Sequence, residues 1–512
     1  MSADEAAPEY DVVVVGSGGG ALTGAALAAK AGLSVLVLER TPLIGGTSAY
    51  SGGACWLPGT DVQQRAGLPD STEGARAYLA AVLDDPDPAR VEALLTEAPR
   101  LVATLEADEL MEFEWIPFAE YFDAPGRVPM GRSIQPSAIS RADLPAEVTD
   151  ILRPPVERDR AGRPGRSTLS GGQALIGRLA AMAVRDGAVI AVGHQVVGFE
   201  RADDGRVSGV QAMGPEGPVT ITARHGVLVA AGGFEGSPER RQQHGTPGRA
   251  AWSMAPRGTN TGEVIDAAAA VGAATDFSGQ GWFCPGLEQP DGSGTFTLGF
   301  RGGLMVDATG HRYGNECLPY DRFGRLMAAA PERVPSWFLF DSREGGRLPA
   351  IAMPEGDPAE HLAAGTWVRS DTIEQLAQAA GLPVDAVTTT VERFNGFAAS
   401  GTDEDYGRGE DEYDTFFAGG GTTLLPLDQP PYYAARFVLS DLGTKGGLVT
   451  DGHGRVIDTA GVPIPGLYAA SNSTASVFGS AYPGPGAPLG AAMVYASLAV
   501  ADMLADGAES RS

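Results

Sequence analysis

Cysteine and histidine are scarce in this sequence of 512 residues. Its three cysteines, Cys55, Cys284 and Cys317, form no CxxC pair, so neither a zinc site nor a disulfide framework is indicated. No stretch approaches about 18 uncharged apolar residues, and we expect no helix that spans a membrane. The acidic segment 1–10 also lacks the basic and apolar regions of a secretory signal. These absences predict a cytoplasmic protein without a metal ion, and they leave peripheral contact with a membrane open.

Positive charge is the other shortage, since the formal net charge is −27. A chain of this charge repels phosphate backbones, which excludes nucleic acid as an expected partner. Glycine, by contrast, is abundant at 71 residues and is interleaved with aliphatic runs. This pattern indicates tight turns and close backbone approaches, as in nucleotide sites, rather than disorder.

The length exceeds the roughly 250–300 residues at which a single hydrophobic core stops growing, so two domains are expected. Near the start, the pattern predicts a strand over 10–15, a helix over 21–31 and a second strand over 34–39. The further predicted elements are helices within 74–110, a helix over 171–185, a meander of strands over 188–229, and helices over 370–380, 384–400 and 490–504. We therefore predict an α/β fold, in which a Rossmann-like domain of residues 1–276 and 441–512 is interrupted by an inserted α+β catalytic domain of residues 277–440.

The turn GSGGGA, from Gly16 to Ala21, connects the first strand to the first helix. Gly16 permits the tight turn, Gly18 lets the backbone approach a pyrophosphate, and Ala21 lets the helix pack against the strand. The helix N-terminus then faces the phosphate with free N–H groups. Glu39 ends the next strand, where a carboxylate hydrogen-bonds ribose hydroxyls. Because the glycines lie between a strand and a helix, they predict a dinucleotide site.

The segment after the ribose carboxylate indicates which dinucleotide binds. In GGTSAYSGG (45–53), two glycine pairs bracket hydroxyl residues. This segment resembles the FAD-binding segment of the fumarate reductase/succinate dehydrogenase flavoprotein superfamily. Two more marks follow in the expected order, GVLVAAGGF (226–234) and GLYAASN (466–472), although the usual Gly-Asn of the last is Ser471-Asn472 here.

The resemblance implies FAD as the cofactor. Covalent attachment of FAD in this superfamily uses a histidine that follows the segment corresponding to GGTSAYSGG. Residues 1–193 contain no histidine, so non-covalent FAD is expected. Thr47 and Ser48 would contact the pyrophosphate, and Ser51 to Gly53 would lie near the flavin ring. The full set of expected cofactor-binding residues is Gly16, Gly18, Gly19, Ala21, Glu39, Arg40, Gly46, Thr47, Ser48, Ser51, Gly52, Gly53, Val196, Gly232, Asn472, Pro488 and Leu489.

Tyrosine motifs, rather than cationic clusters, indicate the chemistry. Fumarate chemistry needs arginines and histidines to bind two carboxylates, yet only His311 and His361 lie within 277–440. The chain instead contains AYPGPGAPLG (481–490), NECLPYDRFG (315–324) and PFAEYFDAPGR (117–127). With the two glycine-rich opening segments, these resemble the 3-ketosteroid Δ1-dehydrogenases over nearly the whole chain. The resemblance implies an FAD-dependent oxidoreductase that acts on CH–CH groups, a 3-oxosteroid 1-dehydrogenase of steroid metabolism.

The resemblance also implies a role for five residues. Tyr482 and the backbone N–H of Gly486 would donate hydrogen bonds to the 3-keto oxygen of the steroid. Tyr320 would remove a proton from carbon 2, Tyr121 would hydrogen-bond Tyr320, and Phe118 would line the ring pocket. The flavin would take hydride from carbon 1. Two preorganised donors on one oxygen would stabilise the developing enolate, as an oxyanion hole does.

Two details qualify this assignment. Family members often have Pro-Asp before the tyrosine at position 121, where this chain has Ala119-Glu120. An unperturbed tyrosine has a pKa near 10, so only about 0.1% is ionised at neutral pH. We therefore expect a rate that rises from about pH 6 to about pH 9 if Tyr320 is the base.

Three alternatives stay open at this point. They are a 3-ketosteroid Δ4-(5α)-dehydrogenase, a flavin-dependent reductase of small unsaturated acids in the same superfamily, and a non-catalytic flavoprotein. A second nucleotide fingerprint is absent from the sequence, so we expect a quinone or another acceptor in place of NAD(P). The chain is expected to act as a monomer on a 3-ketosteroid substrate.

Overall fold

The structure is a computed structural model that describes residues 7–509. The described part of the chain forms two compact units. The first unit comprises Met1–Arg240, Ala255–Gln280 and Thr444–Ser512, and the second comprises Arg241–Met254 and Gly281–Gly443. Each unit therefore contains segments that are distant in sequence.

The strands of the first unit are β1 (Glu9–Val15), β2 (Val35–Glu39), β3 (Phe113–Trp115), β4 (Ile134–Pro136), β5 (Ile139–Ser140), β6 (Thr168–Leu169), β7 (Val189–Val192), β8 (Gln195–Arg201), β9 (Val207–Gly214), β10 (Gly217–Val229), β11 (Thr275–Asp276), β19 (Gly447–Leu448), β20 (Arg455–Ile457) and β21 (Pro463–Ala469). Its helices are α1 (Gly19–Lys30), α2 (Asp61–Arg65), α3 (Thr72–Val82), α4 (Pro88–Glu106), α5 (Ala146–Thr149), α6 (Val156–Asp159), α7 (Gly172–Arg185), α9 (Glu263–Ala270) and α15 (Ala487–Glu509), with short 3-10 turns at η1 (Gly46–Tyr50) and η6 (Ser471–Ser473).

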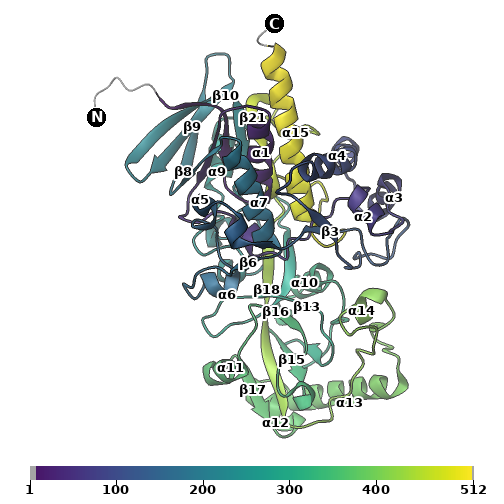
Figure 1. The fold of residues 1–512 in the computed structure, drawn as a ribbon. Helices are drawn as coiled ribbons and strands as arrows, with labels where there is room; N and C mark the ends of the chain where they lie inside the picture. Colours follow the sequence, from purple (N-terminus) through teal and green to yellow (C-terminus); the bar gives the residue numbers. More distant parts are fainter. Residues whose placement is uncertain (1–6, 510–512) are drawn as a thin grey trace. The chain divides into compact units, whose positions relative to one another are not determined.

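A sheet whose central strands are parallel forms the centre of the first unit. Within the described residues it has eight strands, with the path β20-β21-β10-β1-β2-β7, and β9 pairs with β10 and carries β8 on its other side. β1 runs parallel to both β2 and β10, and β10 runs parallel to β21. Buried parallel strands are typically continuous aliphatic runs, as in the VVVV of β1. The predicted α/β class is confirmed for this unit (Figure 1).

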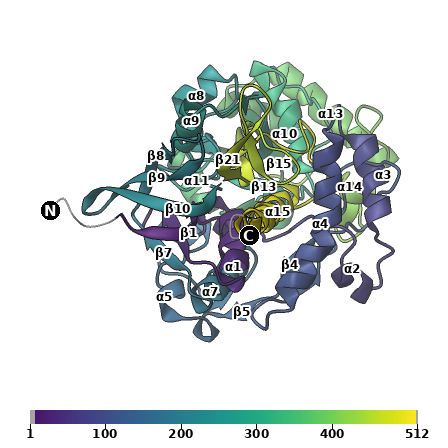
Figure 2. The same cartoon turned by 90° about the horizontal axis from the view of Figure 1, so that it is seen from above.

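Helix α15 packs against α1 in both views (Figures 1 and 2). The contact is close because α1 carries glycines on that side. A Cβ at Gly20 would lie 2.8 Å from the carbonyl oxygen of Ala492 in α15. Among the described residues, one segment, Ala487–Gly507, is long and apolar enough to cross a membrane, with a mean hydropathy of 1.5. Since 61% of that segment is buried inside the structure, it is packed as a core helix.

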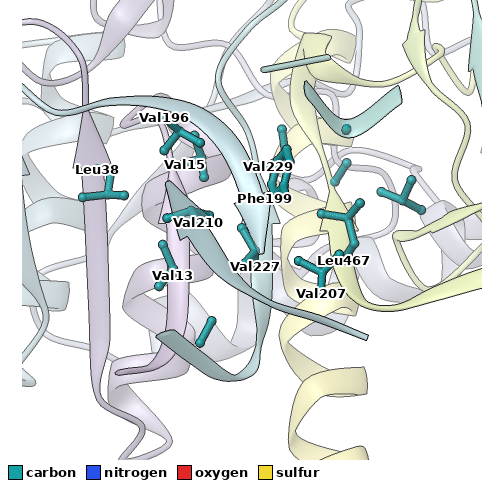
Figure 3. Packing of buried hydrophobic residues seen from close by; sticks show 14 of the residues in the cluster. Val13, Val15, Leu38, Val196, Phe199, Val207, Val210, Val227, Val229 and Leu467 are labelled. Atoms are coloured by element: carbon teal, nitrogen blue, oxygen red, sulfur yellow. The ribbon is translucent and has the colours of Figure 1, made fainter. Parts of the chain in front are cut away.

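Aliphatic side chains from several strands form the core next to the parallel sheet. Val13, Val15 and Leu38 extend from β1 and β2, and they pack with Val196 of β8 and Val210 of β9 (Figure 3). All five are almost fully buried. Strands β8 and β9, which lie within the meander predicted over 188–229, therefore pack over part of this aliphatic core.

The strands of the second unit are β12 (Gly281–Leu287), β13 (Phe296–Leu298), β14 (Leu304–Val306), β15 (Ser336–Phe340), β16 (Ile351–Met353), β17 (Trp367–Ser370) and β18 (Tyr432–Thr444), the last of which ends in the first unit. Its helices are α10 (Tyr320–Ala328), α11 (Pro358–Ala364), α12 (Ile373–Ala380), α13 (Val384–Ser400) and α14 (Glu412–Phe416), and α8 (Pro238–Gln243) lies where the chain passes between the units.

The described residues of the second unit build a sheet with the path β12-β18-β15-β14, to which β17 adds at β18. Its core is aromatic, and the rings of Phe340 and Tyr433 stack with centroids 5.3 Å apart. The helix predicted from residue 370 begins instead at Ile373. The reason is that Ser370 pairs with Tyr432 in the sheet and that the Thr372 side chain caps the helix.

Candidate active site

The first unit contains a pocket at the carboxyl ends of β1, β2 and β10. This is the edge at which open parallel sheets bind ligands. The pocket is lined by residues from eight separate segments, so no short motif describes it completely. The predicted cofactor residues among its lining are Gly16, Gly18, Glu39, Arg40, Gly46, Thr47, Ser48, Val196, Gly232 and Asn472.

Glycines shape the first side of the pocket. Gly16 has a φ of +101°, and a Cβ there would lie 2.5 Å from the carbonyl oxygen of Ala230. The fold itself therefore requires glycine at position 16. Gly18 differs, because its φ is −72° and, of the described atoms, only Ser48 Oγ at 3.4 Å would contact a Cβ there. The space that a side chain at Gly18 would take is therefore not filled by protein atoms and is open to a ligand.

The Glu39 carboxylate is held at the end of β2. The Ser17 hydroxyl donates to its Oε2 at 2.6 Å, and the Thr41 backbone N–H donates to its Oε1 at 2.8 Å. The Ser17 oxygen in turn accepts the Gly45 N–H at 3.0 Å. Arg40 donates to Thr261 Oγ1 at 2.7 Å, which ties the pocket to the segment before α9. A carboxylate in this fixed position suits the ribose hydroxyls of a dinucleotide.

The other predicted cofactor residues occupy neighbouring positions and are not part of this lining. Ala21 is buried inside α1, and the Gly19 N–H donates to Ser48 Oγ at 3.1 Å. A Cβ at Gly53 would lie 2.4 Å from the carbonyl carbon of Gly171, so the loop Ser51, Gly52, Gly53 packs on the start of α7. Pro488 and Leu489 lie in the first turn of α15, and a Cβ at Gly19 would lie 2.5 Å from Leu489 Cδ1. Their contact with a cofactor stays a prediction.

Sequence reasoning missed the segment GTNTGE, residues 258–263, which forms one wall of the pocket. Asn260 has a φ of +52°, a left-handed conformation that asparagine tolerates better than most residues. Its amide donates to Glu235 Oε1 at 2.5 Å. An asparagine between two threonines, in a segment with a glycine at each side, could have signalled such a turn. Other lining residues outside the predicted motifs are Arg153, His194 and Gln195.

The loop Tyr482–Gly486, called the donor loop below, precedes α15 and is held through its carbonyl groups. The Pro483 carbonyl accepts the Tyr121 N–H at 3.2 Å and the Tyr78 hydroxyl at 2.6 Å. The Pro485 carbonyl accepts the Ser133 hydroxyl at 2.6 Å, and the Gly486 carbonyl accepts the N–H of Trp56 at 3.2 Å. Burial raises the pKa of Tyr78, which keeps its hydroxyl protonated as a donor. Three carbonyl groups of the loop are thus fixed before any ligand binds.

Gly486 occupies a position that only glycine can fill. Its φ is +79°, and a Cβ would lie 2.1 Å from the carbonyl oxygen of Ala54. Gly484 packs under the indole of Trp56, where a Cβ would meet Cδ1 at 3.0 Å. The glycines of YPGPG therefore let the donor loop lie flat on the segment 54–56, and the prolines restrict it further.

Three predicted aromatic residues converge on this loop. The ring of Tyr121 meets the ring of Tyr482 edge-on with centroids 5.2 Å apart, and Phe118 lies against Tyr121 at 6.4 Å. Tyr121 and Tyr482 are each only 2% exposed. The structure thus brings Phe118, Tyr121, Tyr482 and Gly486 together in the first unit.

Glu120, at the point where this chain departs from the family pattern, anchors the segment that carries Tyr121. Its buried carboxylate accepts Arg132 Nε at 2.7 Å, the indole N–H of Trp56 at 2.9 Å and the N–H of Val128 at 2.8 Å. A buried charge is tolerated when it is paired and hydrogen-bonded in this way. Where family members often have Pro-Asp, this chain therefore holds the segment through the buried ion pair of Glu120 with Arg132.

Tyr320 begins α10 in the second unit and is 4% exposed. Its ring packs edge-on against Phe296 with centroids 4.7 Å apart, and the neighbouring Asp321 carboxylate accepts Arg325 Nε at 2.7 Å. Burial raises the pKa of the nearby Cys317 thiol to about 11, so this cysteine is protonated and inert at neutral pH. The described residues contain no group of His, Cys, Asp or Glu that could hold a metal ion.

Replacement of Gly18 by alanine tests whether the pocket holds FAD, the predicted cofactor. The variant Gly18→Ala should fold normally but bind FAD about 10- to 100-fold more weakly. The added methyl group would occupy space that the ligand needs, and the steric conflict should cost about 1–3 kcal/mol of binding free energy. FAD titration of the apoprotein, followed by flavin fluorescence, gives the dissociation constant. Gly396→Ala is the control, since Gly396 lies inside the helix Val384–Ser400 without a left-handed φ and has no described atom within 4 Å of its Cβ position. Equal FAD affinity in wild type and Gly18→Ala would contradict the prediction.

Comparison with known proteins agrees with this geometry. The FAD binding domain family matches residues 11–489 of the chain. A 3-oxosteroid 1-dehydrogenase of Rhodococcus opacus is 41% identical over 97% of this chain and 98% of its own length. A 4-oxocyclohexanecarboxylate 2-dehydrogenase of Sinomonas cyclohexanicum is 34% identical over 96% of this chain and 92% of its own length.

Among solved structures, 3-ketosteroid delta1-dehydrogenase from Sterolibacterium denitrificans, in complex with 1,4-androstadiene-3,17-dione, has a TM-score of 0.89. It is 31% identical, and the match covers 97% of this chain and 100% of that one. The family and the FAD cofactor predicted from the sequence are confirmed. The chain belongs to the 3-oxosteroid 1-dehydrogenase family of FAD-binding flavoproteins.

Proposed function

We propose that this chain is an FAD-dependent 3-oxosteroid 1-dehydrogenase, which introduces the double bond between carbons 1 and 2 of a 3-ketosteroid. The observation that carries the proposal is the donor loop. It places a buried tyrosine hydroxyl and a glycine N–H in one rigid segment, next to a second buried tyrosine. The full-length identity of 41% to a 3-oxosteroid 1-dehydrogenase supports the same activity.

In this proposal, the donor loop polarises the ketone. The hydroxyl of Tyr482 and the N–H of Gly486 bind the 3-keto oxygen, which makes the protons of carbon 2 acidic. Donors that are fixed in advance require no reorganisation when negative charge develops on that oxygen. Bound FAD supplies a hydride acceptor for carbon 1.

The remaining roles follow from the same assignment. Tyr320 takes the proton from carbon 2, Tyr121 hydrogen-bonds Tyr320, and Phe118 covers a steroid ring. The cofactor residues predicted from the sequence hold FAD, with Glu39 at the ribose and Gly18 at the pyrophosphate. Residues 1–276 and 441–512 form the FAD-binding domain, and residues 277–440 form the inserted catalytic domain. We also propose a cytoplasmic monomer that passes electrons to a quinone or a similar acceptor.

An anaerobic titration with androst-4-ene-3,17-dione tests the function. Bleaching of the oxidised flavin absorbance, with formation of the 1,4-diene, is the expected result. Bleaching only by the 5α-saturated analogue would move the assignment to a 3-ketosteroid Δ4-(5α)-dehydrogenase. A protein whose flavin stays oxidised with both steroids would not be a ketosteroid dehydrogenase.

A second candidate substrate class is a small cyclic ketone with a carboxylate. The relative from Sinomonas cyclohexanicum, named 4-oxocyclohexanecarboxylate 2-dehydrogenase, favours it at 34% identity. Both reactions remove hydrogen next to a ketone, so the donor loop suits either. Flavin reduction rates with androst-4-ene-3,17-dione and with 4-oxocyclohexanecarboxylate, measured side by side, separate the two classes.

A further inference from the structure

Lysine is rare in this chain, and one of its two lysines is buried beside the donor loop. Of 37 basic residues, only Lys30 and Lys445 are lysines. Lys30 is exposed at the end of α1, whereas Lys445 is 2% exposed in the turn after β18. A buried ammonium group is costly unless it is compensated by hydrogen bonds or by an aromatic face. The contacts of Lys445 therefore indicate what the charge does there.

The side chain of Lys445 hydrogen-bonds both residues that immediately precede Tyr482. Its Nζ donates to the carbonyl of Ser480 at 2.7 Å and to the carbonyl of Ala481 at 2.9 Å. An ammonium group is a compact charge whose donors can diverge to two adjacent carbonyls, unlike the planar fork of arginine. The backbone of Lys445 is fixed as well, because its N–H donates to Gln280 and its carbonyl accepts the N–H of Ser476.

The same ammonium group lies beside the ring of Tyr482, with Nζ 5.9 Å from the ring centroid. A cation at this distance is attracted to the aromatic face. It also favours the build-up of negative charge on the phenol oxygen, which strengthens any hydrogen bond that the hydroxyl donates. Lys445 thus acts on Tyr482 both through the preceding backbone and through the ring.

We propose that Lys445 is a positioning residue for the ketone-binding donors Tyr482 and Gly486. The proposal rests on the proposed function, since it names a residue that supports the same site. Lys445 fixes the two residues before the donor loop, and the hydrogen bonds to the carbonyls of Pro483, Pro485 and Gly486 fix the loop itself. Removal of the ammonium group should leave FAD bound but let the Tyr482 hydroxyl move away from the ketone oxygen.

The first test compares Lys445→Met with Lys445→Arg and with the control Lys30→Met. Lys445→Met should lower kcat for androst-4-ene-3,17-dione by about 10- to 100-fold, with a much smaller change in KM, because a donor misplaced by about 1 Å acts mainly on the transition state. Lys445→Arg keeps the charge and should recover part of that loss, and Lys30→Met should behave as wild type. All rates are normalised to bound FAD.

The outcome that overturns the proposal is a Lys445→Met protein with the kcat of the wild type. A fall in kcat that merely follows lost FAD or lost thermal stability also overturns it. If the wild-type protein neither turns over nor binds a 3-ketosteroid, the proposed function fails and this inference falls with it. Turnover by the wild type together with a fully active Lys445→Met overturns this inference alone.

The second test observes the lysines directly and needs no turnover. Protein labelled with carbon-13 at the lysine ε position should give two NMR signals. Each signal is assigned by its loss in Lys30→Met or in Lys445→Met. Addition of androsta-1,4-diene-3,17-dione, the expected product, should shift the Lys445 signal and leave the Lys30 signal in place. A Lys445 signal that does not move, while flavin absorbance shows that the steroid is bound, would exclude contact between this lysine and the ketone-binding loop.

Discussion

Tyr320→Phe should lower kcat for a 4-ene-3-ketosteroid by about 100- to 10 000-fold, the usual contribution of a general base. The phenyl ring keeps the packing against Phe296, so the variant should fold and bind FAD as the wild type does. Stopped-flow measurement of anaerobic flavin reduction gives the rate of the chemical step. In the wild type this rate should rise from about pH 6 to about pH 9, because a tyrosine base must lose its proton.

Tyr313→Phe provides a matched control in the same unit. Its hydroxyl bonds Ser336 Oγ at 2.8 Å in the buried core, so its loss should cost about 1 kcal/mol of stability. The rate of flavin reduction should not change. Reduction of Tyr320→Phe at the wild-type rate would show that another group removes the proton.

Tyr482→Phe should lower kcat by about 100- to 1000-fold, which corresponds to the loss of one oxyanion donor at about 2.7–4 kcal/mol. The N–H of Gly486 remains, so turnover should be slow rather than absent. The pH dependence should keep the shape of the wild type, because the base is untouched. Steady-state kinetics with a dye acceptor, at saturating steroid, measures this change.

Tyr495→Phe is the control for the donor loop. It is a buried tyrosine of α15 whose hydroxyl donates to the carbonyl of Arg90 at 2.8 Å. Its activity per bound FAD should equal that of the wild type. If Tyr482→Phe and Tyr495→Phe lose activity to the same extent, the Tyr482 hydroxyl contributes only to folding.

Much of the fold could be predicted because local patterns agree with the global arrangement. The strand over 10–15, which ends in four consecutive valines, and the glycine turn after it specify β1, α1 and β2 almost completely. Where prediction failed by a few residues, the deciding contact was distant in sequence. Ser370 joins β17 because it pairs with Tyr432, about which residues near 370 carry no information.

The candidate site could be predicted where a residue type is required by geometry. Gly16 and Gly486 are such positions, since their backbone conformations exclude other residues. Lys445, Glu235 and Asn260 could not be identified, because their importance comes from partners that the fold brings together. Glu120 departs from the family pattern in sequence, and only the fold shows that its pairing with Arg132 anchors the segment that carries Tyr121.

The order of strands in the central sheet also determines how late in synthesis the protein can complete its fold. β10 lies between β1 and β21, so its second parallel neighbour is separated from it by more than two hundred residues of sequence. A nascent chain that has not yet exposed β21 presents an unpaired strand edge, which is prone to aggregation. Glu39 and Asn472, which both line the pocket, are likewise synthesised early and late in translation. Flavin capture must therefore follow synthesis of almost the entire chain, so supply of FAD during translation should matter less than protection of the β10 edge.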